Sequence, residues 1–318
     1  MTVGRFAPSP TGDLHLGSAL AALGAWASAR GAGGRFVYRV EDLDGPRAVP
    51  EAAERQIEDA RWLGLDWDEG PDVGGPHGPY RQSERGDRYE DALARLAEAG
   101  RAFPCRVSRK DLMEVATAPH GHTGLPPYPA SLRPARLGAG WYAEATDCAV
   151  RFRVEPGTVA FEDRVVGHVE EDVSRAVGDF VLKRRAGVYA YQLAVVVDDL
   201  AMGVTEVVRG LDLLESTARQ VLLGRALGGT PPSYAHLPLL VTADGQKLSK
   251  RDGPLSIRSL REAGVAPEAV VGWLAGALGV GDGAPCTPRD VARTFHVSSV
   301  TSVPIAVPDD LYDRLGGS

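Results

Sequence analysis

Two short segments far apart in the chain carry residues suited to binding a polyphosphate. The first, APSPTGDLHLGS, places His15 and Gly17 where a helix is predicted to begin, after a loop with two prolines. A helix N-terminus offers free backbone N–H groups and a positive dipole end, glycine permits close approach, and histidine adds a hydrogen bond. The alternative interpretation is a rigid strand-to-helix connection with a surface histidine.

The second segment, DGQKLSKR at 244–251, contains two lysines in a chain that otherwise uses arginine. Only four of the 35 basic residues are lysine, and Lys247 and Lys250 are two of them. Two ammonium groups three positions apart on a loop can converge on one polyphosphate. A solvated charged turn is the usual interpretation of such a run, but in this composition a generic surface cation would more often be arginine. The pair therefore favours phosphate binding.

The overall composition is that of a globular protein long enough for a large core. The 318 residues are 44% hydrophobic and 24% charged, with a formal net charge of −7. This charge argues against non-specific coating of nucleic acid, although a local arginine-rich face could still bind RNA. No leader peptide or apolar run of membrane-spanning length is found, so we expect a cytoplasmic protein without a membrane span. Cys105, Cys148 and Cys286 are too few and too scattered for a disulfide framework.

Alternating patterns in the first hundred residues predict a doubly wound parallel sheet. Strands are expected at 3–7 and 35–42, where apolar residues run together or alternate. Helices are expected at 14–31, 49–65 and 83–100, from helical spacing of apolar residues and from capping signals. In such α/β sheets a ligand binds at the carboxyl ends of the strands.

The alternation of predicted strands and helices ends near residue 100. Residues 101–186 begin with a stretch rich in Pro, Gly and Arg, and then contain short strand-like segments that suit antiparallel pairing, so we interpret them as an insertion. The continuous apolar runs at 189–199 and 204–210 suit buried parallel strands and predict that the sheet resumes there. A helix is expected at 215–227, and helical patterns dominate from Ser256 onward.

Five motifs in order give the chain a resemblance to the class I aminoacyl-tRNA synthetases in their glutamyl form. The family's two signature motifs are similar to FAPSPTGDLHLGS and LPLLVTADGQKLSKRDG, and further family motifs match YRVEDLD, YAYQLAVVVDDLAMGVTEVVRG and AHLPLL. The similarity covers most of residues 3–280. Ser18 stands where the general class I pattern has histidine, a departure that the glutamyl branch tolerates.

The resemblance implies a class I Rossmann-like doubly wound sheet with an α+β insertion and a short helical carboxy-terminal stem. The implied domains are a first half of the catalytic domain at 1–100, an acceptor-binding-like insertion at 101–186, a second half with the lysine loop at 187–255, and a stem at 256–318.

The resemblance also implies a site for glutamate beside a site for ATP. Glutamate carries two carboxylates and one ammonium, so its site needs two cations and an anion. The matched motifs assign glutamate binding to Arg5, Ala7, Ser9, Glu41, Tyr191 and Arg209. They assign ATP binding to Phe6, Pro8, His15, Gly17, Ser18, Lys247, Ser249 and Lys250. His15, Lys247 and Lys250, with Mg²⁺, are the implied catalytic groups, and no protein nucleophile is required.

Without the motifs, other interpretations of these side chains would stand. Arg5 and Arg209 would be explained by salt bridges at the surface or at the end of the sheet, and Tyr191 by core packing.

Only a short segment follows Arg251, so we expect no anticodon-binding domain of the kind that a full glutamyl-tRNA synthetase has. The truncated form resembles a tRNA-modifying branch whose members activate L-glutamate with ATP, without tRNA, and transfer it to queuosine in the anticodon loop of tRNA(Asp). We expect a monomer. Arginines at 106, 109, 133 and 136 could meet RNA phosphates, or could form a solvated basic loop.

Three alternatives remain open at the level of sequence. They are a truncated glutamyl-tRNA synthetase, an inactive paralogue that binds tRNA or a protein, and another adenylate-forming nucleotidyltransferase that joins a carboxylate to an amine. The intact glutamate and ATP positions argue against the inactive paralogue.

The sequence departs from its relatives at a zinc site. Many members have C-x-C followed by Y-x-x-x-C, whereas this chain has CRV and YPASL, which leaves one thiolate. Zinc needs four good ligands, so we expect no zinc. A set recruiting His120 and His122 is the alternative, although histidines in a Gly/Pro loop are usually solvated. We expect apolar packing, with Val107 and Leu132 contributing, to hold the insertion instead.

Overall fold

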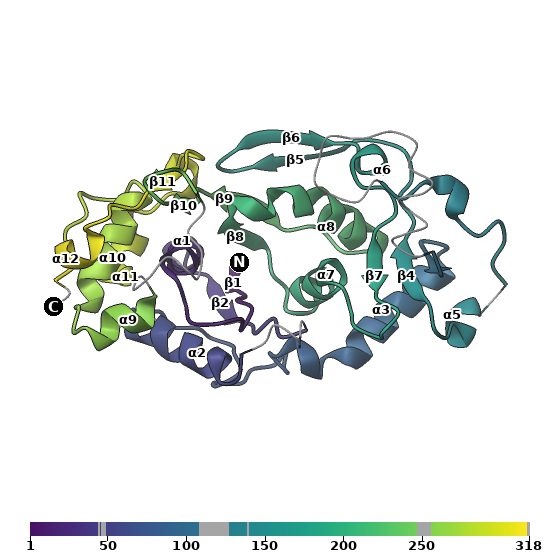
Figure 1. Cartoon of the computed structure of the whole chain (residues 1–318), viewed down its shortest axis with the longest axis horizontal. Helices are drawn as coiled ribbons and strands as arrows, with labels where there is room; N and C mark the ends of the chain where they lie inside the picture. The colour runs from purple at the N-terminus through teal and green to yellow at the C-terminus, as the bar shows by residue number, and fades with distance from the viewer. Residues whose placement is uncertain (44, 46–48, 108–126, 139, 247–255, 317–318) are drawn as a thin grey trace.

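A parallel α/β layer lies in the middle of the molecule, between a helical end and a mixed end (Figure 1). The computed structural model describes the chain except for residues 44, 46–48, 108–126, 139, 247–255 and 317–318. Lys247, Ser249 and Lys250 therefore lie outside the described residues.

The layer begins with two parallel strands joined by a long helix. Strand β1 (Val3–Phe6) pairs with β2 (Arg35–Tyr38), with Val3 opposite Arg35. Helix α1 (Leu16–Gly31) connects them and buries a largely Ala and Leu surface against the strands. Gly4 permits this close packing, because a Cβ atom there would lie 2.9 Å from the Cβ of Ala29.

Strands β8 (Glu206–Gly210) and β9 (Ser233–Leu237) extend the layer as a second parallel pair. Thr205 connects β8 to β1: its N–H donates to the Val3 carbonyl at 3.0 Å, and its Oγ1 accepts from the Val3 N–H at 2.9 Å. Helix α7 (Tyr191–Ala201) precedes β8, and α8 (Leu214–Ala226) connects β8 to β9.

A hairpin from the middle of the chain joins the far edge of β9. Strands β5 (Val159–Asp163) and β6 (Gly167–Glu171) pair antiparallel, and β5 also pairs in parallel with β9 through Asp163 and Tyr234. The strand order in this sheet is β6-β5-β9-β8. The hairpin thus places residues 159–171 beside the second parallel pair.

The mixed end holds an antiparallel sheet with short helices. Its strands are β3 (Ala102–Cys105), β4 (Ala149–Phe152) and β7 (Val181–Lys183), in the order β3-β4-β7. Further helices in the described part of the chain before α7 are α2 (Ala52–Trp62), α3 (Gly86–Glu98), α5 (Trp141–Glu144) and α6 (Val173–Ala176).

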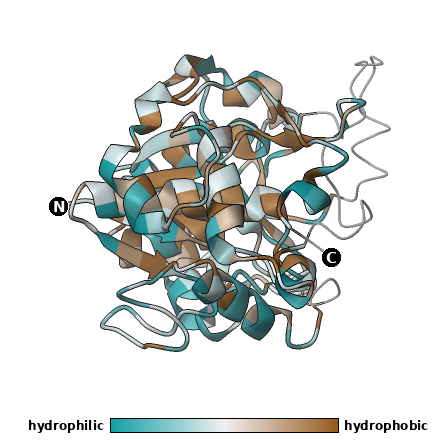
Figure 2. Cartoon of the chain, turned by 90° about the vertical axis from the view of Figure 1, so that its left-hand side faces the viewer, coloured by the Kyte–Doolittle hydropathy of each residue, from teal (hydrophilic) through white to brown (hydrophobic). Residues whose placement is uncertain are grey.

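The carboxy-terminal residues form the helical end. Their elements are α9 (Ile257–Glu262), α10 (Pro267–Ala277), α11 (Pro288–Thr294), α12 (Leu311–Arg314) and a small parallel pair of β10 (Leu240–Val241) with β11 (Ile305–Ala306). Val270 and Leu274 of α10 share one core with Leu20 and Leu23 of α1. Figure 2 shows this end with its hydrophobic stretches gathered inside and hydrophilic ones outside.

Most predicted helices are confirmed, but one predicted strand is wrong. Helices α1, α2, α3 and α8 lie within or close to their predicted ranges. The segment 189–199, predicted as a buried strand, instead forms most of α7. Its run of apolar residues is buried on every side, so the period that distinguishes a helix from a strand is absent. Within the part of the chain that the structure describes, no helix is long and apolar enough to cross a membrane.

The junction of α2 with α9 buries a carboxylate. The side chain of Asp59 is fully buried, and neither of its oxygens accepts a hydrogen bond from a described residue. The nearest cationic nitrogen is Arg258 Nη2, 3.3 Å from Asp59 Oδ1. Burial raises the pKa of Asp59 from 3.8 to about 6, despite the nearby guanidinium groups of Arg258 and Arg261.

We expect Asp59→Asn to stabilise the fold at pH 8. The folded state holds the Asp59 proton between pH 3.8 and about 6, where the unfolded chain has lost it, so stability falls as pH rises through that window. Removing the charge should raise the free energy of unfolding by roughly 1–3 kcal/mol at pH 8 and by less at pH 5. Chemical denaturation at both pH values measures this. Glu58→Gln on the exposed side of α2 is the matched control and should give no gain. A loss of stability in Asp59→Asn at pH 8 would contradict the prediction.

Candidate active site

A cavity of about 510 Å³ opens at the carboxyl ends of β1, β8 and β9. The structure brings to its wall every predicted site residue that it describes: Arg5, Phe6, Ala7, Pro8, Ser9, His15, Gly17, Ser18, Glu41, Tyr191 and Arg209. These residues come from segments that lie far apart in the chain, from Arg5 to Arg209. The roles assigned to them by motif stay predictions, but they share one cavity.

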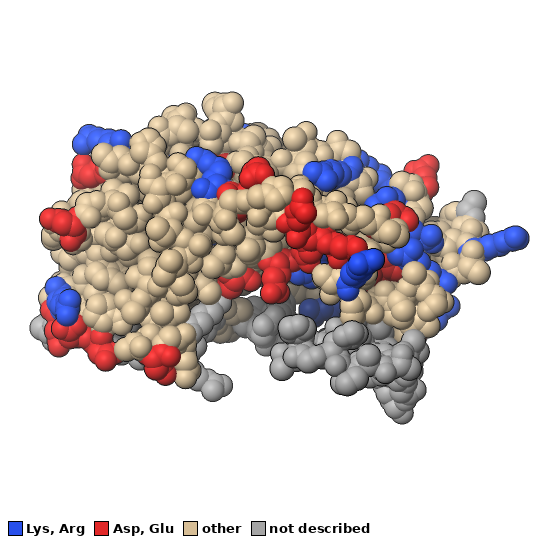
Figure 3. Space-filling view, turned by 90° about the horizontal axis from the view of Figure 1, so that it is seen from above, with Lys and Arg blue, Asp and Glu red and all other residues tan. Residues whose placement is uncertain are grey.

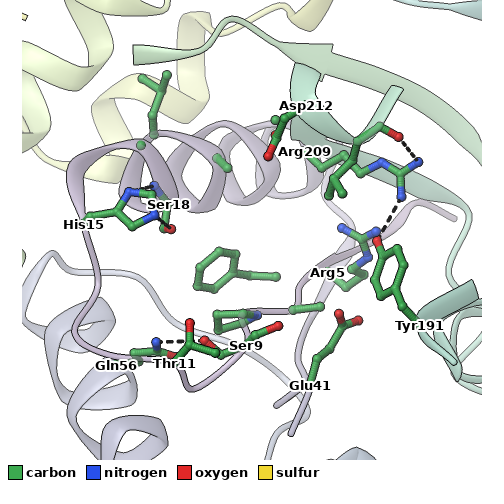
Figure 4. A pocket seen from close by; sticks show the side chains of 18 of the residues that line it. Arg5, Ser9, Thr11, His15, Ser18, Glu41, Gln56, Tyr191, Arg209 and Asp212 are labelled. Carbon is green, nitrogen blue, oxygen red and sulfur yellow. Dashed lines mark hydrogen bonds between the residues drawn. The ribbon is translucent and has the colours of Figure 1, made fainter. Parts of the chain in front are cut away.

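The polar side chains of the cavity divide into two groups (Figure 4). Arg5, Glu41, Tyr191 and Arg209 gather at one end, and His15 lies with Ser18 at the other. The first group combines cations with a carboxylate, whereas the second lies at the start of α1. One cavity can therefore hold an amino acid beside a phosphate-bearing molecule.

Arg209 is a buried cation with neutral partners only. Its Nε donates to His236 Nε2 at 3.0 Å, Nη1 donates to Gln220 Oε1 at 2.8 Å, and Nη2 donates to Thr217 Oγ1 at 2.8 Å. Two longer contacts reach the Tyr191 hydroxyl at 3.5 Å and the Leu213 carbonyl at 3.3 Å. No carboxylate among the described residues pairs with this guanidinium, which is 4% exposed. Burying an unpaired charge is costly, so the site suits an incoming anion.

Arg5 is a second buried cation that is only loosely paired. Its Nε lies 3.6 Å from Asp199 Oδ1 and makes no hydrogen bond. Asp199 is already engaged, because Arg39 Nη1 donates to the same oxygen at 2.7 Å. The Arg5 guanidinium therefore retains donors for a second anionic group at the same end of the cavity.

Glu41 provides the negative charge at this end. Arg39 Nη2, which does not line the cavity, donates to Glu41 Oε1 at 3.0 Å and fixes the carboxylate. Burial raises the pKa of Glu41 above its usual range, while Arg39 and Arg5 oppose the shift. A substrate ammonium would restore the favourable environment of the charged form. Burial likewise raises the pKa of Tyr191, so its hydroxyl stays protonated and can donate a hydrogen bond.

The start of α1 is built around the His15 ring. His15 is the N-cap residue: its Nδ1 accepts from the Ser18 N–H at 3.1 Å, and its Nε2 lies 2.9 Å from Ser18 Oγ. A Cβ atom at Gly17 would lie 3.2 Å from two atoms of the His15 ring. Glycine at this position therefore avoids a close contact that would displace the ring. Ser256, just after the lysine-bearing segment, forms an antiparallel bridge with His15. The described chain therefore resumes, at Ser256, beside the start of α1.

Several cavity and supporting residues were missed at the level of sequence. Thr11, Asp13, Gln56, Gln82, Arg184, Tyr189 and Asp212 also line the cavity. Arg39 is fully buried and connects Glu41 with Asp199, while Asp198 accepts from Arg85 Nε at 2.5 Å. The sequence did contain a signal for Asp198 and Asp199, the two acids of VVVDD inside an otherwise apolar run. Acidic residues are seldom fully buried unless they are paired, so this pair indicated buried cationic partners.

The segment that departs from the zinc pattern is held by side-chain packing. Arg151 Nε donates to the Cys105 sulfur at 3.3 Å, and the Arg151 guanidinium lies 4.3 Å from the centre of the Tyr128 ring. Val107 and Leu132 pack against Cys105 and Tyr128, as predicted. His120 and His122 lie outside the described residues. Within the described part, no group of three or more His, Cys, Asp or Glu is arranged to hold a metal.

Comparison with known proteins places these observations in a family. Residues 1–307 match the family model of the class I tRNA synthetases (E and Q), catalytic domain. A glutamyl-Q tRNA(Asp) synthetase from Symbiobacterium thermophilum is 50% identical over all of this chain and 99% of its own length. Another from Nitratidesulfovibrio vulgaris is 47% identical over 99% of this chain and 98% of its own length.

A solved structure agrees with these matches. A glutamate tRNA ligase from Elizabethkingia meningosepticum, crystallised with its amino acid, has a TM-score of 0.86 and 29% identity. The match covers 99% of this chain and 68% of that one. The α/β fold is therefore that of a class I synthetase catalytic domain. The chain belongs to the class I tRNA synthetases of the E and Q type and, among them, to the glutamyl-Q tRNA(Asp) synthetase family.

Proposed function

We propose that the chain activates L-glutamate with ATP in the absence of tRNA and transfers the glutamyl group to queuosine in the anticodon loop of tRNA(Asp). The observation that carries the glutamate assignment is the cation pair Arg5 and Arg209 beside Glu41. Both guanidinium groups are buried, and neither has a close carboxylate partner of its own. Their charges match the two carboxylates and the ammonium of glutamate.

The proposed first step joins the two ends of the cavity. The α-carboxylate of glutamate attacks the α-phosphate of ATP, which gives glutamyl-adenylate and releases pyrophosphate. The N-terminus of α1, His15 and the two lysines would stabilise the charge that develops on the phosphates. Catalysis then depends on alignment and electrostatic stabilisation, because no protein nucleophile is required.

In the proposed second step a hydroxyl group of queuosine attacks the activated carbonyl, and AMP leaves. The names of the full-length relatives support this acceptor. The face in Figure 3 carries acidic side chains near its middle and more basic ones toward the end with β4 and β7. RNA phosphates would favour the basic part. Arg133 is not free for this role, because it donates to both carboxylate oxygens of Asp179 at 2.7 Å.

Mg²⁺ would enter this reaction on the phosphates of ATP, since it is usually held by substrate phosphates and few protein carboxylates. The Cys105 sulfur is in contact with Arg151 Nε and the Tyr128 hydroxyl. These protein contacts support the proposal that the insertion does not use zinc.

Two assays test the proposal. We expect glutamate-dependent pyrophosphate exchange without tRNA, followed by transfer of labelled glutamate to tRNA(Asp) that contains queuosine. The same tRNA(Asp) lacking queuosine is the control and should accept none. Transfer to the 3′ end of tRNA(Glu) would favour a truncated glutamyl-tRNA synthetase instead. Absence of exchange with glutamate would refute the proposal.

A further inference from the structure

A line of three buried side chains runs from β5 across β9 and β8 to the cavity. His236 on β9 lies between Arg209 on β8 and Asp163 at the end of β5. The His236 Nδ1 atom is 2.6 Å from Asp163 Oδ2, and its Nε2 is 3.0 Å from Arg209 Nε. The three residues are 0–4% exposed. Only Arg209 lines the cavity, so the other two can act on a ligand only through it.

The hydrogen bonds assign the proton of His236 to one nitrogen. Arg209 Nε can only donate, so His236 Nε2 must accept, and the ring proton must lie on Nδ1 and point to Asp163. Burial lowers the pKa of His236, in keeping with a neutral ring beside a guanidinium. Asp163, whose pKa falls to about 2 through hydrogen bonds from His236 and backbone N–H groups, is ionised and accepts this proton. Every donor along the line faces an acceptor.

The hydrogen bonds of Arg209 also determine which of its N–H groups are left for a ligand. Three short bonds, to His236, Gln220 and Thr217, hold Nε and one N–H of each terminal nitrogen. The remaining N–H groups make only the long contacts to Tyr191 and Leu213. One loosely held N–H on each terminal nitrogen suits a two-pronged bond to a carboxylate.

We propose that Asp163 and His236 are positioning residues that orient Arg209 for the carboxylate of the amino-acid substrate. This inference rests on the proposed function, in which Arg209 binds glutamate. Asp163 belongs to the β5–β6 hairpin, and its Oδ1 accepts from the backbone N–H groups of Val165, Val166 and His236 at 2.9–3.2 Å. The hairpin from the middle of the chain therefore takes part in amino-acid recognition without touching the substrate.

Two replacements of His236 separate positioning from simple packing. The amide of His236→Asn can reach Asp163 in place of Nδ1 but offers Arg209 no acceptor. The longer His236→Gln can place its amide oxygen where Nε2 accepts from Arg209. We expect His236→Asn to raise the KM for glutamate roughly 10-fold or more, and His236→Gln by only about 3-fold or less, in pyrophosphate exchange. The KM for ATP should change in neither variant.

If His236 serves only to hold the hairpin against β9, the order reverses. His236→Asn would then be the milder variant, since it keeps the bond to Asp163, and this result would overturn the proposal. Thermal unfolding of both variants reports any loss of fold separately.

Asp163→Asn tests whether the ring proton of His236 lies on Nδ1. The carboxylate accepts at both oxygens, so an amide group must present a donor to one of those partners. If the introduced amide donates to His236 Nδ1, the ring proton must move to Nε2. The Nε2–H would then face the Nε–H of Arg209, and two donors would meet. We expect a rise in the KM for glutamate like that of His236→Asn; an unchanged KM would contradict the proposed role.

A double-mutant cycle makes the test independent of folding effects. If His236 acts through Arg209, His236→Asn should add less than about 2-fold to the KM for glutamate once Arg209→Lys is present. A full additional 10-fold effect in that background would overturn the proposal. Failure of the proposed function is distinguishable, because the unmodified protein would then show no glutamate-dependent exchange.

Discussion

Replacing Arg209 by glutamine is expected to raise the KM for glutamate roughly 100-fold or more in pyrophosphate exchange. The guanidinium is buried and lacks a carboxylate partner among the described residues, so a bound carboxylate would lose its charged partner and face neutral amide groups. Loss of one partner of a buried charge pair costs about 3–5 kcal/mol. Arg209→Lys should recover only part of the affinity, because an ammonium cannot make the two-pronged contact.

The stability of the Arg209→Gln variant provides a second readout. Since the cation is not neutralised by a described carboxylate, its removal should not lower the melting temperature as loss of a buried ion pair would. Arg293→Gln, on the exposed face of α11 and away from the cavity, is the matched control and should leave both KM values unchanged. An altered KM for ATP with a normal KM for glutamate would remove Arg209 from the amino-acid site.

Lys250→Ala is expected to lower the rate of adenylate formation by roughly two or more orders of magnitude, while glutamate binding survives. The reason is the charge that develops on the phosphates in the transition state, which a positioned ammonium stabilises. Lys250 lies outside the described residues, and its assignment rests on the KLSKR motif. Pyrophosphate exchange measures the rate, and calorimetry measures glutamate binding.

Lys247→Ala is the matched comparison for Lys250→Ala. The two variants remove the same group from the same segment, and we expect the loss of rate to be smaller at Lys247. Near-normal exchange in Lys250→Ala would end the assignment of this lysine to catalysis.

The local elements follow from the sequence where one face of the element is buried. In α3 the buried residues Tyr89, Leu93 and Leu96 recur at helical spacing, and they lie on one face of the helix. In α7 the residues Val195, Val196 and Val197 are all buried, together with Asp198. Such a segment shows no alternation, so its length and neighbours give no basis for choosing a helix over a strand.

The cavity could be predicted from motifs, but its supporting contacts could not. Arg5, Glu41 and Arg209 were identified as residues of separate motifs, and the fold brings them to one end of the cavity. His236 lies in the matched AHLPLL motif, yet its partner Asp163 is 73 positions away in the chain. A contact of that range depends on which strand lies beside β9, and strand order is a property of the whole sheet.

The bond between β1 and β8 has a consequence for synthesis of the chain. Val3 and Thr205 are separated by 202 positions, so their pairing closes a very long loop. The entropy of that closure must be offset by contacts that form only afterwards, which slows such folding steps. The side of β1 that faces Thr205 must therefore stay unpaired until β8 has emerged from the ribosome, although β1 can pair with β2 earlier, and the cavity is completed only after β9 follows. Until then the apolar surface of α1 is a surface for chaperones to cover.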